Sequence, residues 1–302
     1  MGTSVQGKKE SRRIETIIRR YLKTGEDSSR AELQYKQPFS HPTKEEILIA
    51  LSEEVSRRER DRPRATLPPG IDPLSLARTK ATPMVSGLFP AAEREPVRRV
   101  LEESIVFLSA DNIHRVLTSD RWLGTAWRVA SIYLDSIGAM PLGRGNFQAV
   151  GLGEETTSYI SLKYFSEDDP FADYVVHEMA HVFHNWKRAW TGLREIRHRK
   201  FLLNIKFAKR ETFAFACEVY SRILELGHSP KERRQLLERF GRESKIGDKG
   251  KDRVELLQIL TAAVEARNGW KRILEMCLDD KPKRWVPSIP SPNLPIQPGL
   301  QR

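Results

Sequence analysis

A segment between residues 169 and 190 separates its polar and apolar side chains onto two faces at helical spacing. Asp169 is a residue type that caps helices and Pro170 suits the first helical position, so the sequence predicts a helix over about 170–189. One face carries His177, His181 and His184. The opposite face carries Val175, Met179, Val182, Trp186 and Trp190. Such a helix buries its apolar stripe in a core and aims the histidines out of it.

His177 and His181 stand one helical turn apart, so both imidazoles can reach one metal ion. Glu178 lies beside them on the helix, where a carboxylate can hold water next to a metal and take its proton. An ordinary pair of surface histidines is the competing interpretation. The pattern falls on a capped amphipathic helix that follows a predicted strand, which favours a zinc site with His177 and His181 as ligands and Glu178 as the catalytic residue.

A catalytic zinc ion needs a third protein ligand, and a second amphipathic helix over about 208–226 offers one. Glu211 and Glu218 share its polar face, but they are seven residues apart, or about 10 Å along the axis, so both cannot ligate one ion. We predict Glu211, because it lies near the start of a helix that can return antiparallel past His177. Glu218 would then orient a histidine N–H or pair with Arg222. Glu218, His184 and His198 remain alternative third ligands.

Tyr159 to Phe165 alternates in period two and, with the apolar run Phe147 to Val150, predicts a small antiparallel sheet ahead of the histidine helix. Further helices are predicted over about 110–118, 121–137, 230–241, 251–267 and 269–278. Residues 93–108 could form one helix, or end in a strand over 105–108. The predicted fold class is therefore α+β, mainly helical.

The predicted domains are a basic amino-terminal segment with a linker (1–90), a mainly helical domain (91–280) and a Pro-rich tail (281–302). Apolar spacing predicts a helix over 14–22, and Thr43 with Glu46 forms a capping box for a helix that ends near Arg58. Residues 60–96 contain repeated prolines, which predict an extended linker or arm.

The chain has 302 residues and a net charge of +11. That charge would suit an acidic partner or nucleic acid, although a basic surface is its ordinary explanation. The two cysteines, Cys217 and Cys277, exclude a disulfide-rich scaffold and a four-cysteine zinc site, and predict buried thiols. No apolar run approaches the 18 residues of a membrane span, and the first residues lack the apolar stretch of a signal peptide. A cytoplasmic location is expected.

His177-Glu-Met-Ala-His181 matches the motif of zincin metallopeptidases, and Glu211-Thr-Phe-Ala214 resembles the third-ligand segment of gluzincins. The resemblance covers about residues 160–225 and implies a zincin-like domain that binds Zn2+ and cleaves a protein or peptide substrate. In gluzincins the edge of the strand before the motif pairs with substrate, a place that Tyr159–Phe165 matches. Lys187 stands where metzincins have a histidine, and Phe215 where thermolysin-like enzymes have an aspartate, so neither group fits.

The sequence therefore predicts peptide hydrolysis by metal-activated water with Glu178 as general base. Tyr220, His198 and His228 are candidate donors to the oxyanion. The alternatives are a zincin that acts on proteins bound to nucleic acid, and a basic binding module whose metal site is absent or inert.

Overall fold

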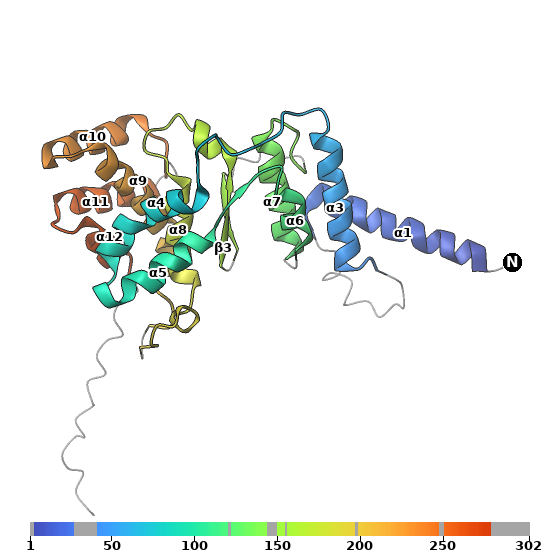
Figure 1. Ribbon diagram of the computed structural model, residues 1–302, viewed down its shortest axis with the longest axis horizontal. Coiled ribbons are helices and arrows are strands. Elements are labelled where there is room, and N and C mark those ends of the chain that lie inside the picture. The colour runs from blue at the N-terminus through green and yellow to red at the C-terminus, as the bar shows by residue number, and fades with distance from the viewer. Residues whose placement is uncertain are drawn as a thin grey trace, which may run out of the picture.

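A three-stranded sheet divides the chain into two helical bodies (Figure 1). The computed structural model describes residues 3–26, 41–119, 122–143, 150–154, 156–196, 199–247 and 251–278. Helices of the amino-terminal body are α1 (Thr3–Thr24), α3 (Lys44–Glu59), α6 (Ile113–Thr118) and α7 (Leu123–Ser136). The other body contains α4 (Pro73–Leu88), α5 (Ala91–Ser104), α8 (Tyr174–Asn185), α9 (Arg210–Leu226), α10 (Pro230–Glu243), α11 (Lys251–Glu265) and α12 (Gly269–Cys277). The mainly helical α+β class is as predicted.

The sheet is mixed, whereas an antiparallel sheet was predicted. Its order is β1 (Ile105–Leu108), β3 (Thr157–Ser161) and β2 (Gly151–Glu154), with β1 parallel and β2 antiparallel to β3. The parallel pair joins segments that are distant in sequence, so local alternation could not predict it. Of the alternatives for residues 93–108, the helix followed by a strand is the one observed.

The strand predicted over Tyr159–Phe165 is partly wrong. β3 ends at Ser161, whose side chain accepts a hydrogen bond from Lys163 N and begins a 3-10 turn over Leu162–Ser166. Serine hydroxyls stabilise such turns against extended backbone. Leu162 and Tyr164 therefore follow the alternating apolar pattern in the sequence, but they lie in the 3-10 turn and not in the strand.

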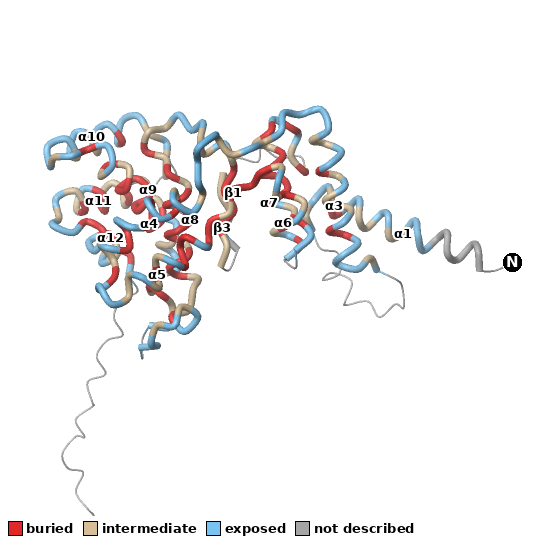
Figure 2. Tube along the Cα trace, viewed as in Figure 1, coloured by how far each residue is buried: buried red, intermediate tan, exposed pale blue. Residues whose placement is uncertain are grey.

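Alternate strand residues face two different cores, because successive side chains point to opposite sides of a sheet. Ile105, Phe107 and Ile160 belong to the larger core, which lies on the side of α8. Leu108 and Tyr159 belong to the smaller core, which lies on the side of α7. Figure 2 shows buried segments on both sides of the sheet.

The smaller core is formed mainly by the amino-terminal body. Thr43 and Glu46 form the predicted capping box at the start of α3. Leu51 and Val55 of α3 are buried there, and the buried Tyr21 hydroxyl of α1 donates to Leu123 O. These contacts hold α1 and α3 against α6 and α7, which follow β1 in sequence.

The predicted linker over residues 60–96 is wrong, because most of it is helical. Asp72 caps α4, Pro73 occupies its first turn and Pro90 precedes α5. Proline is favoured at the start of a helix. The N–H groups there have no hydrogen-bond partner within the helix, so the absence of an N–H in proline costs nothing. Pro83 and Pro96 stand inside the helices, where each forfeits one backbone hydrogen bond. The buried face of α4 packs against α5, α8, α9 and α12.

Packing does not follow the predicted boundary at residue 90. The larger core combines α4 with helices up to α12, and the smaller core combines α1 and α3 with α6 and α7. Cys217 and Cys277 are both buried and unpaired, as predicted. The predicted tail (281–302) lies outside the described residues. No helix in the described part of the chain is long and apolar enough to cross a membrane.

Candidate metal centre

Helix α8 carries the histidines, and it begins four residues later than the sequence indicated. Its N-cap is Asp173, whose side chain accepts from Val176 N. The predicted cap, Asp169, instead accepts from Phe171 N and from the Ser244 hydroxyl, which places it in the turn before the helix. An Asp suits both places, so sequence alone did not distinguish them.

His177, His181 and Glu211 come together at one point. The Nε2 atoms of His177 and His181 are 3.2 Å apart, and Glu211 oxygens lie 3.8 Å from the first and 3.6 Å from the second. One ligand atom from each residue lies within 4.8 Å of the others. Glu211 is 72% exposed along its side chain, whereas the two imidazoles are 12% and 15% exposed. The cluster is therefore open on the side of Glu211.

Helix α9 brings Glu211 to the histidines by running antiparallel to α8. Its first turn carries Glu211 beside His177 and His181, while Glu218, two turns later, lies behind His177. Glu218 Oε2 accepts from His177 Nδ1 at 3.0 Å, and Oε1 accepts from Asp173 N at 2.9 Å. Of the roles predicted for Glu218, the structure shows the orienting contact with a histidine.

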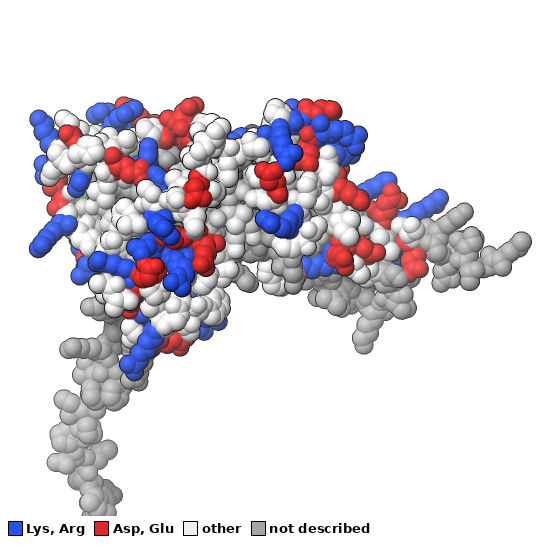
Figure 3. All heavy atoms as spheres, viewed as in Figure 1, with Lys and Arg blue, Asp and Glu red and all other residues white. Residues whose placement is uncertain are grey.

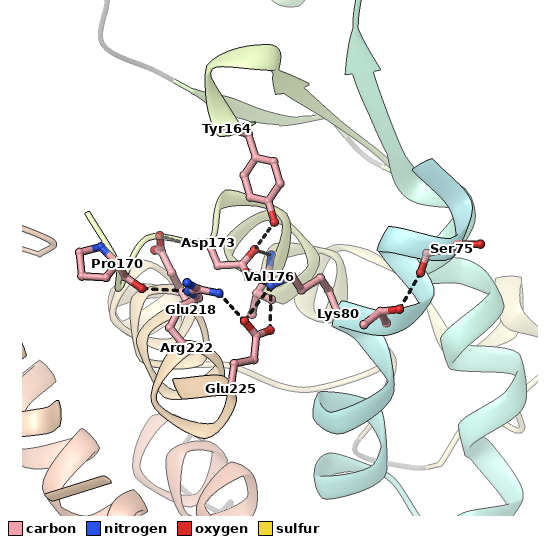
Figure 4. Close-up of polar contacts among 10 residues, drawn as sticks. Ser75, Lys80, Tyr164, Pro170, Asp173, Val176, Glu218, Arg222 and Glu225 are labelled. Atoms are coloured by element: carbon pink, nitrogen blue, oxygen red, sulfur yellow. Dashed lines mark hydrogen bonds and ion pairs between the residues drawn. The ribbon is translucent and has the colours of Figure 1, made fainter. Parts of the chain in front are cut away.

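The cap of α8 is held by a buried polar network (Figure 4). Lys80 of α4 forms ion pairs with Asp173 and with Glu225, both at 2.7 Å. Arg222 pairs with the same Glu225 and donates to Pro170 O, so it does not form the predicted pair with Glu218. The Asp173 side chain is fully buried, and Lys80 is 10% exposed. Lys80 was not predicted to belong to the site, because residues 60–96 were interpreted as a linker.

Glu178 is buried against the edge strand β2. A Cβ built on Gly151 would lie 2.5 Å from Glu178 Oε1, and one on Gly153 would lie 3.2 Å from Oε2. The two glycines thus allow the backbone of β2 to approach the carboxylate. Burial raises the pKa of Glu178 to about 7, opposed by the charge of His177. Glycines alternating in a strand were the sequence feature that could have indicated this close approach.

The strand expected to offer its edge to substrate is central. β3 is paired on both sides, whereas β2 has β3 on one side and no described strand on the other. The expectation for Tyr159–Phe165 is therefore corrected: β2 is the edge strand beside Glu178. Local alternation identifies a strand but not its place in the sheet.

The surroundings of the three histidines on α8 shift their pKa values in opposite directions. Burial alone would lower the pKa of His177, but its hydrogen bond to Glu218 and the nearby carboxylates raise it. Burial, with the charges of His177 and Arg210, lowers the pKa of His181 to about 2. Burial and Arg210 lower the pKa of His184 to about 3. His181 is thus a neutral imidazole, the form that ligates metals.

Of the three side chains predicted as donors to the oxyanion, Tyr220 and His228 lie in the described part of the chain, and neither is at the His177–His181–Glu211 cluster. Tyr220 packs edge to face on Trp270, with ring centroids 5.0 Å apart. His228 follows the carboxyl end of α9, roughly 25 Å along the axis from Glu211. His198 lies outside the described residues. Arg210, which was not predicted to belong to the site, is a cation that contributes to the lowered pKa of both His181 and His184.

No family model, curated protein or solved structure matches this chain.

Proposed function

We propose that this protein is a zinc-dependent peptidase, with Zn2+ held by His177, His181 and Glu211. The observation that carries the proposal is the convergence of these three side chains within 4.8 Å, from two helices, with Glu178 buried alongside. Two histidines and one glutamate are a ligand set of catalytic zinc sites that hydrolyse peptides.

The chemistry of these donors fits a cation. The Glu218 carboxylate can only accept, so it fixes the His177 proton on Nδ1 and leaves a lone pair on Nε2. That lone pair faces His181 Nε2 at 3.2 Å and the Glu211 carboxylate. Three carboxylates, Glu178, Glu211 and Glu218, raise the pKa of His177, so the local field favours positive charge.

Zinc in this place would act as a Lewis acid and lower the pKa of water towards neutrality. The chain supplies the proton acceptor, because the Glu178 carboxylate follows His177 on α8 and is buried next to the histidines. Burial beneath β2 keeps the carboxylate out of bulk solvent, which strengthens its interaction with a developing charge. Glu178 would then return the proton to the leaving amine.

The edge of β2 supports a peptide as the substrate. An extended peptide can add to an unpaired strand edge through backbone hydrogen bonds. Gly151 and Gly153 of β2 lie directly over Glu178, so a peptide added there would pass beside the general base. This arrangement favours substrates that are extended in the segment to be cut.

Zinc analysis of the purified protein tests the site. We expect about one zinc per chain, bound more weakly or lost in both His177→Ala and Glu211→Ala. Zinc retained in Glu211→Ala but lost in His177→Ala would refute Glu211 as a ligand. Absence of zinc from the wild type, even after refolding with the metal, would refute the proposed function.

A proteome-wide cleavage screen tests the reaction. The wild type should generate new peptide termini that a Glu178→Gln variant with full zinc content does not. Equal cleavage by both proteins would exclude Glu178 as the base.

Association with nucleic acid gains no support from the face in Figure 3, where lysines and arginines are interspersed with acidic residues.

A further inference from the structure

His184 is a buried imidazole whose contact points at the metal centre. It is 4% exposed and lies at the carboxyl end of α8, one turn beyond His181. Its Nε2 is 3.3 Å from His181 Nδ1, and the two rings meet edge to face with centroids 5.2 Å apart. Its other nitrogen, Nδ1, is buried and has no hydrogen-bond partner among the described residues. His181 Nδ1 is therefore the described hydrogen-bond partner of the buried His184 ring.

The contact defines the proton positions of both rings once His181 Nε2 binds a cation. A ligating Nε2 presents a lone pair, so the proton of neutral His181 must sit on Nδ1. Nδ1–H then donates to His184 Nε2, which must be unprotonated, and the His184 proton sits on its Nδ1. The opposite arrangement would put the His181 proton on Nε2 and block the ligand.

We propose that His184 is the positioning residue of His181, accepting the Nδ1–H of His181 and thereby holding its Nε2 lone pair towards Glu211. The inference rests on the proposed function and extends it, because each ligand histidine then has its own acceptor. His177 is held by the charged carboxylate of Glu218, and His181 by a neutral imidazole. Outer acceptors of this kind fix the tautomer and orientation of a ligand ring.

Zinc affinity, measured by competition with a chromophoric chelator, tests the inference without relying on activity. His184→Phe keeps an aromatic ring but removes the acceptor, and its zinc dissociation constant should rise by roughly 10- to 100-fold. His184→Gln restores an acceptor through its side-chain oxygen and should bind zinc much more tightly than His184→Phe. His228→Gln changes an exposed histidine far from the cluster and should match the wild type. With cobalt in place of zinc, the visible spectrum of His184→Phe should shift.

Each outcome separates the inference from the proposed function. Wild-type zinc binding with unchanged affinity in His184→Phe would refute the role of His184 while leaving the zinc site standing. A wild type without zinc would refute both. If His184→Phe does not fold, nitrogen-15 NMR of zinc-loaded wild type decides, because a proton on His184 Nε2 would contradict the inference and one on Nδ1 would support it.

Discussion

Lys80→Met removes the ammonium that lies 2.7 Å from the buried carboxylate of Asp173. Asp173 is fully buried, so in this variant its carboxylate would lose its ion-pair partner and would still not be solvated by water. Breaking one side of a buried ion pair costs about 3–5 kcal/mol of unfolding free energy. For a chain of 302 residues that corresponds to a fall in Tm of roughly 5–8 °C. Glu225, 34% exposed and paired with Arg222, should contribute little to the loss.

Urea unfolding followed by circular dichroism measures this loss, with Lys163→Met as the matched control. Lys163 also pairs with an aspartate at 2.7 Å, but it is 45% exposed, so its removal should cost at most about 1 kcal/mol. Adding Asp173→Ser to Lys80→Met removes the buried charge and keeps a capping side chain, so stability should largely return. Similar losses in the two lysine variants, or no recovery in the double variant, would refute the reasoning.

The same pair predicts a pH dependence. Burial raises the pKa of Asp173 in the folded protein, and the charge of Lys80 opposes that rise. A carboxyl whose folded pKa lies above its unfolded value loses stability as the pH rises from the unfolded to the folded pKa. Removing Lys80 raises the folded pKa further, so the destabilisation of Lys80→Met should be larger at neutral pH than in mild acid. A deficit that grows on acidification would contradict this sign.

Two further predictions concern the site itself. Glu218 accepts from two donors, His177 Nδ1 and Asp173 N. Glu218→Gln has one acceptor oxygen for these two donors and no negative charge, so zinc affinity should fall by roughly 10- to 100-fold in a chelator competition. Unchanged affinity would argue against the orienting contact. Gly151→Ala places a methyl group 2.5 Å from Glu178 Oε1 and should displace that carboxylate. In the proposed peptidase, cleavage should therefore fall at least about tenfold, while zinc content stays at the wild-type level. Gly124→Ala is the control and should leave cleavage unchanged, because a Cβ at residue 124 would have no other atom within 4 Å. A Gly151→Ala variant that cleaves as fast as the wild type would exclude a close approach of β2 to Glu178.

Helical periodicity predicted the geometry of the candidate site well. The spacing of His177, His181 and Glu178 fixes their places on one helix, because each residue turns a helix by a constant angle. The choice of Glu211 over Glu218 needed one further assumption, that the two helices run antiparallel. The structure has that arrangement, with Glu218 behind His177.

The structure differed from the predictions in segments whose sequence is compatible with more than one local structure. Prolines near Pro73 and Pro90 suggested an extended chain, yet proline also begins helices, and the buried face of α4 favoured the helical alternative. Lys80 could not be recognised as buried before its partners on α8 and α9 were known. The order of the sheet depended on the pairing of β1 with β3, which no local pattern contains.

The placement of α6 and α7 between β1 and β3 has a consequence for any shortened form of this protein. These helices cannot be removed without breaking the sheet, and α1 and α3 cover the apolar surface that they share. A chain that starts after α3 would still contain the candidate metal centre, but it would expose the residues that now surround Leu51 and Val55. The amino-terminal helices therefore keep this apolar surface covered, and expression trials should retain them even when only the candidate metal centre is of interest.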